Sequence, residues 1–168
     1  MFVSNTRFYQ VDKGDKLYRR SLYTFWKRSA PPASMDIFNG PTRETCTVRR
    51  ERTDTPLQAL VTMNDPQFVE AARFLSQQAL SDNGGDIDRQ FDWIATRLLA
   101  RRFDSREREI AKRSYHDYLA YYEAHEGEAQ NLLKVGESAV DKTLAGPRLA
   151  ALTMVTNQVM NLDEVLNK

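Results

Sequence analysis

Apolar residues recur at helical spacing along most of the chain. The clearest stripe lies over residues 87–101, where Ile87, Phe91, Ile94 and Leu98 fall at i, i+4, i+7 and i+11 and predict one face of an amphipathic helix. Similar patterns predict helices that begin at four further positions, Pro56, Pro66, Ser105 and Pro147. The last of these helices is expected to continue to Leu166. These patterns predict an all-α fold.

Capping residues support the predicted helix starts. Thr55 precedes Pro56 and Asp65 precedes Pro66, which is the order of an N-cap residue and a proline in the first helical turn. Asp104 comes directly before another apolar stripe in the same way. Three helix starts are therefore marked by local chemistry as well as by the apolar pattern.

Residues 17–28 contain a cluster of aromatic side chains. Tyr18, Leu22, Tyr23 and Trp26 fall at i, i+4, i+5 and i+8 and fit one face of a helix, although aromatic residues also favour strands. We predict a helix here. Helical spacing also favours packing of these aromatics in the core over stacking on bases or sugars.

Residues 30–42 contain three prolines and one glycine, so no regular element is expected to cross them. Met35, Ile37 and Phe38 lie in this segment and are too apolar for a freely solvated loop. We therefore predict a long ordered Pro-rich loop, pinned by these side chains to an irregular helical domain of about five to six helices. Residues 1–16 are expected to form a loose lead-in.

Length, charge balance and cysteine content exclude several classes of protein. The chain has 168 residues, which suits a single domain over its whole length. Lys and Arg number 24 against 23 for Asp and Glu, and this balance argues against nucleic acid as the main partner. No apolar run reaches the roughly 18 residues of a transmembrane helix, and residues 1–10 lack the pattern of a secretory signal. The single cysteine, Cys46, excludes an internal disulfide and a multi-cysteine metal or haem-attachment motif.

Four unbroken stretches resemble one protein family. They are residues 19–35 (RRSLYTFWKRSAPPASM), 46–60 (CTVRRERTDTPLQAL), 64–73 (NDPQFVEAAR) and 161–166 (NLDEVL). These stretches are similar to the C-terminal portion of domain of unknown function 1553, a family of large secreted bacterial proteins that is especially expanded in planctomycetes. The family has no established biochemical activity, so the resemblance identifies the chain without explaining it.

The resemblance implies a larger parent protein. Members usually have another domain before this one, and many have an N-terminal cytochrome-c-like module with a haem site. We therefore expect the chain to be the C-terminal fragment of a larger extracytoplasmic protein whose preceding domains are its partners. The resemblance allows haem in that parent, whereas no cofactor is expected in this chain. The oligomeric state stays open.

The densest group of charged residues precedes the helix that begins at Pro56. Four arginines are the candidate anion ligands, namely Arg43, Arg49, Arg50 and Arg52. Three carboxylates accompany them, namely Glu44, Glu51 and Asp54. Because the two signs are nearly matched, an internal ion-pair network is the favoured interpretation. The alternative is part of an enzyme site for sulfated or acidic polysaccharide, in which the carboxylates act as acid–base groups.

Other chemically reactive residues have structural interpretations. Cys46 is expected to be a small buried hydrophobe rather than a reactive thiol. His116 and His125 lack the i, i+4 spacing of paired metal ligands, so no metal site is expected. Asp163 and Glu164 are expected to be solvated or salt-bridged. The favoured function is a structural or interaction role as a helical module, and whether the chain is part of an enzyme stays open.

Overall fold

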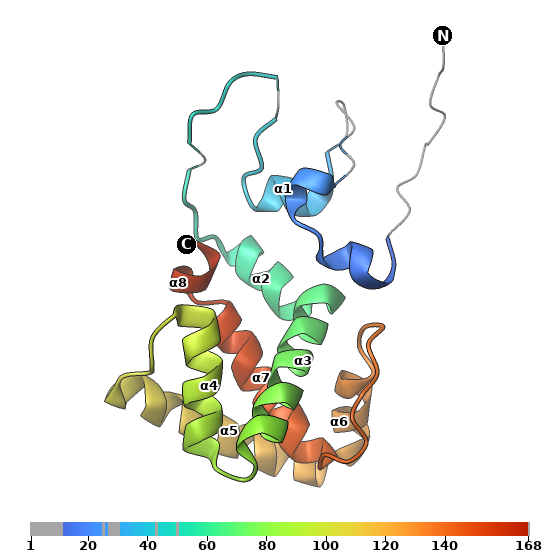
Figure 1. Ribbon diagram of the computed structural model, residues 1–168, viewed down its shortest axis with the longest axis vertical. Coiled ribbons are helices and arrows are strands. Elements are labelled where there is room, and N and C mark those ends of the chain that lie inside the picture. The colour runs from blue at the N-terminus through green and yellow to red at the C-terminus, as the bar shows by residue number, and fades with distance from the viewer. Residues whose placement is uncertain (1–11, 25, 27–30, 43, 50, 168) are drawn as a thin grey trace.

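The regular structure is helical throughout the described part of the chain, which confirms the all-α prediction (Figure 1). The computed structural model describes residues 12–24, 26, 31–42, 44–49 and 51–167. Two 3-10 helices come first, η1 (Gly14–Tyr18) and η2 (Ser21–Tyr23). Eight α-helices follow in these described ranges: α1 (Ala33–Ile37), α2 (Pro56–Asn64), α3 (Pro66–Asn83), α4 (Ile87–Leu99), α5 (Ser105–Ala124), α6 (Glu126–Leu133), α7 (Gly146–Met160) and α8 (Asp163–Leu166). None of the helices in these ranges has the length and apolarity that a membrane crossing requires.

The predicted caps form at the starts of α2, α3 and α5. The Thr55 hydroxyl accepts a hydrogen bond from the Gln58 amide at 3.3 Å, and the Gln58 side chain accepts one from the Thr55 amide at 3.0 Å. Asp104 and Glu107 form the same reciprocal capping box at the start of α5. Asp65 caps α3 by accepting from the Gln67 amide at 2.8 Å. These bonds satisfy backbone donors that the first helical turn leaves free.

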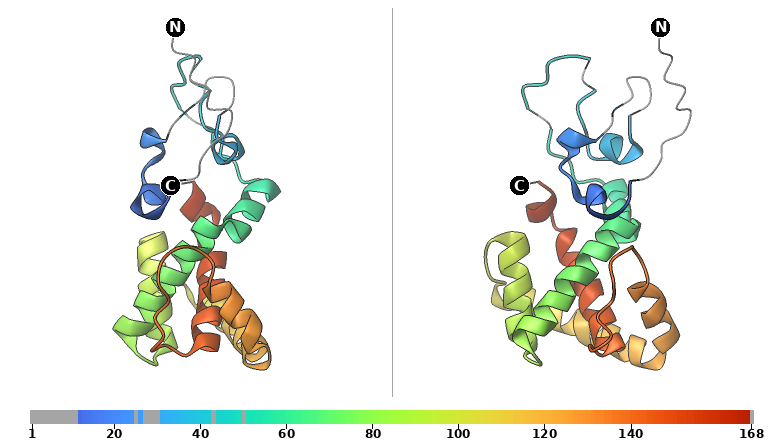
Figure 2. Two further views of the ribbon diagram at one scale, coloured as in Figure 1. Left: turned by 90° about the vertical axis from the view of Figure 1, so that its right-hand side faces the viewer. Right: turned by 45° about the vertical axis from the view of Figure 1, so that its right-hand side comes forward.

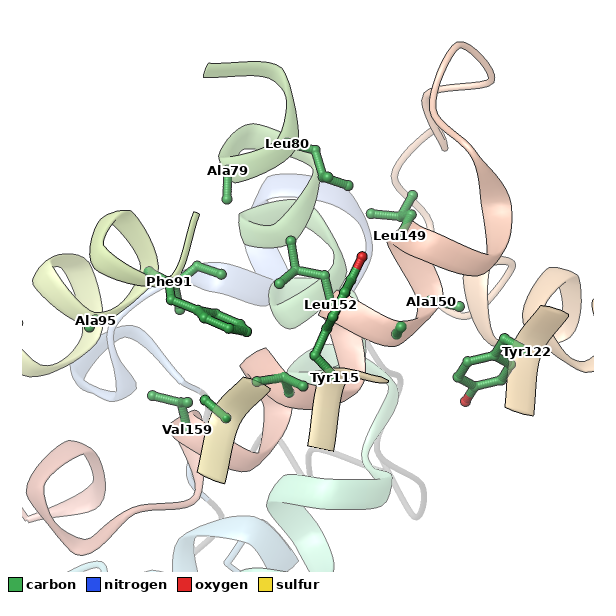
Figure 3. Close-up of a cluster of buried hydrophobic side chains, with 14 of the residues drawn as sticks. Ala79, Leu80, Phe91, Ala95, Tyr115, Tyr122, Leu149, Ala150, Leu152 and Val159 are labelled. Atoms are coloured by element: carbon green, nitrogen blue, oxygen red, sulfur yellow. The ribbon is translucent and has the colours of Figure 1, made fainter. Parts of the chain in front are cut away.

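Helix α7 lies at the centre of the molecule and packs against α3, α5 and α6 (Figures 1 and 2). Its Val155 side chain is buried. So are Leu149 and Leu152 of α7 and Phe91 of α4, which point into the same core (Figure 3). Tyr115 of α5 contacts Phe91 edge to face, with ring centroids 6.2 Å apart. A helix that is buried around most of its circumference needs mostly apolar or small residues, and the buried residues of α7 are mainly Leu, Ala and Val together with a few hydrogen-bonding side chains.

Hydrogen bonds between buried hydroxyls and amides join α2 and α3 to α7. The Ser76 and Thr156 hydroxyls lie 2.8 Å apart, and the Asn157 side chain donates to the Thr62 carbonyl at 3.1 Å. The Thr62 hydroxyl donates to the Asn161 side chain at 2.6 Å. Since buried polar groups without partners destabilise a fold, these contacts specify how α2 and α3 pack on α7.

The helix predicted over residues 17–28 does not form in the part that the structure describes. Two short 3-10 helices take its place, and Tyr18, Leu22 and Tyr23 are exposed rather than packed in the core. No side chain caps η1, and an isolated short helix is unstable without tertiary packing. Tyr18, Leu22 and Tyr23 are not covered by the core, so the predicted helix and the predicted core packing of these three side chains were both wrong.

The Pro-rich segment contains α1, so the prediction that no regular element crosses it is wrong. Pro32 is the N-cap residue of α1, where its missing backbone donor has no cost. The predicted pinning is confirmed: Phe38 packs against Phe68 with ring centroids 6.2 Å apart, and the Ile37 carbonyl accepts from the Gln58 side chain at 2.8 Å. Met35 is half-buried as well.

Two further differences lie near the C-terminus. Helix α6 occupies a segment in which no helix is predicted from the sequence, and its buried residues are Ala129 and Leu133. The predicted final helix is divided, because α7 ends at Met160 and Leu162 adopts an extended conformation before α8 begins. The loose lead-in expected over 1–16 overlaps η1, and residues 1–11 lie outside the described ones.

Candidate functional site

A charged pair lies inside the helical bundle on α3. Glu70 and Arg73 are 3% and 1% exposed, and their carboxylate and guanidinium approach to 3.7 Å. Charged side chains are rarely buried to this degree unless they are paired and hydrogen-bonded. The pair is therefore the most unusual polar feature of the described core.

The Arg73 guanidinium is held by the loop between α6 and α7. It donates to the Ser138 carbonyl at 2.9 Å and to the Ser138 hydroxyl at 2.7 Å. It also donates to the Gln77 side chain at 3.0 Å, and more weakly to the carbonyls of Val135 and Ala139. Burial lowers the pKa of Arg73, but a guanidinium keeps its proton in proteins, so the loop is bound by a cation.

The Glu70 carboxylate accepts hydrogen bonds from two directions. The amides of Glu137 (3.0 Å) and Ser138 donate to Oε1, and the Tyr18 hydroxyl donates to Oε2 at 2.6 Å. Burial alone raises the pKa of a carboxyl, but hydrogen bonds from Ser138, Tyr18 and Glu137 outweigh it and lower the pKa of Glu70 to about 2. Burial and the hydrogen bond to Glu70 raise the pKa of Tyr18 to about 12. Glu70 is thus an anion and Tyr18 a neutral phenol at neutral pH.

Gly136 allows the loop to approach Glu70 this closely. Its φ is +94°, a conformation that residues with a side chain rarely adopt. A Cβ atom at this position would lie 2.4 Å from Cδ of Glu70. The two amides that bind Oε1 follow directly after this glycine, so it is a structural requirement of the carboxylate site.

A pocket of about 500 Å³ lies beside this cluster. Its apolar wall comes from α3, α4 and α7, and consists of Ala71, Phe74, Leu75, Leu98 and Met160. Its polar lining consists of Tyr18, Glu70 and Ser138. An apolar cavity with a few convergent polar groups is the usual form of a small-molecule site.

Helix α2 presents its apolar side to solvent. Leu57, Leu60 and Met63 are 53%, 59% and 45% exposed, whereas Gln58 and Thr62 are 2% and 0% exposed. The buried polar side chains are satisfied, since Gln58 donates to the Ile37 carbonyl and Thr62 to the Asn161 side chain. We refer to Leu57, Leu60 and Met63 as the α2 apolar face. An ordinary surface helix buries its apolar side and exposes its polar side, whereas α2 does the opposite.

The predicted arginine cluster lies on the extended segment before α2. Arg49 and Arg52 are exposed, as are the carboxylates Glu44, Glu51 and Asp54. No ion pair joins Arg49, Glu51, Arg52 or Asp54 to another residue that the structure describes. The favoured ion-pair network therefore does not include these four residues in the described part.

The other members of that cluster, Arg43 and Arg50, lie outside the described residues. The cluster as a whole stays a predicted anion site. Neither Arg49 nor Arg52 lines the pocket beside Glu70.

The remaining predicted residues have mixed outcomes. Cys46 is exposed, so the prediction that it is buried is wrong. The described residues around it form a loop that lies away from the bundle, where no core is available to bury the side chain (Figure 1). Glu164 is salt-bridged as expected, at 2.6 Å from Arg101. His116 is exposed on α5, and the His125 ring stacks on Tyr121 with centroids 4.5 Å apart.

The Glu70–Arg73 pair was missed because charged residues one turn apart usually form a solvated surface pair. A signal for it exists in the sequence. Arg73 lies in register with the apolar stripe of Val69, Ala72 and Leu80, so it occupies a core position of α3. A charged residue within an apolar stripe indicates a buried partner elsewhere in the chain.

Comparison with known proteins identifies a family match. A family model described as a protein of unknown function (PSD1, DUF1553) matches residues 2–115. The match includes α1 to α4, Glu70 and the α2 apolar face, and it ends within α5. No curated protein matches the chain. No solved structure matches it either.

Proposed function

Because the chain belongs to the DUF1553 family, whose model matches more than half of it, we propose that it is a non-catalytic helical module of a larger extracytoplasmic protein. In this proposal the module packs against the domains that precede it in the longer protein. The observation that supports the proposal is the α2 apolar face, which is exposed although α2 has polar residues available for that side.

The exposure of Leu57, Leu60 and Met63 is energetically unfavourable in water. Complete burial of a leucine or methionine side chain contributes about 1.5–3 kcal/mol, and each of these side chains is already partly covered. A partner that covers the face therefore gains roughly 1 kcal/mol from each side chain. Three such side chains on one helix would contribute roughly 3 kcal/mol to contact with a neighbouring segment of the same polypeptide.

Other exposed apolar side chains lie at the same end of the molecule. Tyr18, Leu22 and Tyr23 belong to the N-terminal helices, which lie with α1 and α2 above the α3–α7 bundle in Figure 1. The views in Figure 2 place these elements at the same end. Apolar exposure is thus concentrated where the chain enters the fold, which fits a partner that comes from preceding domains.

Site-specific photo-crosslinking tests this proposal in the protein as its organism produces it. A photoreactive amino acid at position 60 is expected to crosslink to a peptide that precedes this chain in the same polypeptide. The matched control is position 110 on α5, because Ile110 is 54% exposed but lies on the bundle. A band at the size of this chain alone, or crosslinks from position 60 only to this chain's own residues, would contradict the proposal.

The arginine cluster supports a second proposal, in which the segment before α2 binds anionic polysaccharide. The supporting observation is that Arg49 and Arg52 are exposed and form no ion pair with another described residue. We expect Arg49→Ala combined with Arg52→Ala to reduce retention on heparin measurably at low salt. Arg106→Ala, an exposed arginine of α5, is the matched control. Equal retention of both variants and the unchanged chain would exclude this proposal.

A further inference from the structure

Among the residues that the structure describes, Glu70 is the one charged residue that lines the pocket beside it. The apolar wall is formed by five side chains from three helices, and the polar end is formed by Tyr18, Glu70 and Ser138. Tyr18 and Glu70 both line the pocket, so the hydrogen bond between the phenol and Oε2 lies at the pocket wall. A ligand that enters the pocket therefore meets an apolar surface and, at one end, a carboxylate.

The two oxygens of Glu70 have different surroundings. Oε1 accepts from the Glu137 and Ser138 amides and lies 3.7 Å from the Arg73 guanidinium. Oε2 has the Tyr18 hydroxyl as its partner at 2.6 Å. The buried counter-charge and the amides thus stay on one side of the carboxylate. On the other side, the hydrogen-bond partner of Oε2 is a side chain that is itself 53% exposed, and the Gly136 backbone packs close to the same oxygen.

We propose that this pocket binds a small organic ammonium ion, a primary amine attached to an apolar body. The ammonium group donates to Oε2 of Glu70 in place of the Tyr18 hydroxyl, and the apolar body lies against Phe74, Leu75 and Leu98. Tyr18 can leave Oε2 without opening the core, because its ring lies at the surface. This binding is independent of the interaction role proposed above.

The chemistry of the lining favours an amine over other polar groups. An ionised carboxylate only accepts hydrogen bonds, so an anionic ligand is repelled and supplies no donor to Oε2 of Glu70. An alcohol donates one uncharged hydrogen bond, whereas an ammonium donates a charge-assisted one of about twice the strength. The volume of about 500 Å³ accommodates a phenyl ring with a short alkyl chain.

Three ligands with the same skeleton test the proposal: 4-phenylbutylamine, 4-phenylbutanol and 4-phenylbutanoate. Each is titrated into the chain at neutral pH, and binding is followed by the backbone amide signals of Glu137 and Ser138 in nuclear magnetic resonance. These amides donate to Glu70 and so report on its charge environment. We expect saturable shifts with the amine at a concentration at least tenfold below that needed for the alcohol, and none with the carboxylate. Equal effects of all three ligands, or no shifts at these amides, would overturn the proposal.

Substitutions in the pocket distinguish this site from binding elsewhere. Tyr18→Phe removes the competing donor, so we expect amine binding to tighten by threefold or more. Ala71→Leu fills the pocket and is expected to weaken binding at least tenfold, whereas Gln78→Leu on the exposed side of the same helix leaves it unchanged. Glu70→Gln is avoided as the main test because it removes the counter-charge of buried Arg73. Amine binding that is unaffected by Ala71→Leu would place the ligand elsewhere and refute the site.

Discussion

The Glu70 carboxylate is the residue on which the most distant segments of the chain converge. Donors reach it from η1 through Tyr18 and from the loop between α6 and α7 through two backbone amides. The same loop is bound by Arg73 from the other side. The Glu70–Arg73 pair of α3 thus binds the backbone of a loop whose Val140 and Leu144 side chains also pack against the core.

Gly136→Ala is expected to destabilise the chain by about 2 kcal/mol or more. The substitution places a Cβ against Glu70 and forces a side chain into a left-handed backbone conformation. Gly127→Ala in α6 is the control, because a Cβ there meets open space and alanine favours a helix by about 0.5–1 kcal/mol. Urea unfolding measures the change in the free energy of unfolding for both variants. A loss at position 136 no larger than the effect at position 127 would show that the loop does not approach Glu70 as described.

The ionisation of Glu70 predicts a dependence of stability on pH. The pKa of Glu70 is lowered from 4.5 to about 2, so its contribution to stability is fully present above about pH 4.5 and is lost as the pH falls towards 2. In Glu70→Gln this contribution is absent. We expect the free energy of unfolding to fall less steeply in the variant than in the unchanged chain between pH 4.5 and 2. Parallel profiles of the two proteins in urea titrations at several pH values would contradict the assignment.

At the scale of single elements, helices form where a capping residue and an apolar stripe coincide. The starts of α2, α3 and α5 have both signals, and each was predicted. Residues 17–28 have an aromatic stripe without a side-chain cap, and only short 3-10 helices form there. A periodic stripe shows that a helix has an apolar side, but it does not show that a core exists to cover that side.

Asp104→Ala is expected to destabilise the chain by about 1 kcal/mol, because it removes the capping box of α5. Asp117→Ala replaces an exposed aspartate in the middle of the same helix and is expected to have an effect within about 0.5 kcal/mol. Thermal unfolding followed by circular dichroism compares the two variants. Equal losses of stability in the two variants would show that the Asp104 cap adds nothing to the effect of replacing any aspartate of α5 by alanine.

In the whole molecule, the apolar residues of α7 were enough to predict a helix. They did not predict that this helix lies at the centre of the bundle. Leu149, Leu152 and Val155 suffice for one buried side, whereas α7 is buried almost all round. The candidate site was less predictable, since it joins α3 to residues more than sixty positions away in the loop before α7. Such long-range polar contacts leave no periodic pattern in the sequence.

In the function proposed above, the α2 apolar face is covered by a preceding part of a longer protein. The most direct measurement is the effect of Leu60→Ser on thermal unfolding, made both in this chain alone and in the protein isolated from its organism. Leu60 is 59% exposed, so we expect a change within about 0.5 kcal/mol in the free energy of unfolding of the chain alone. We expect a loss of roughly 1 kcal/mol or more in the isolated protein, because the side chain would be buried there at an interface. An equal effect in the two proteins would contradict the claim.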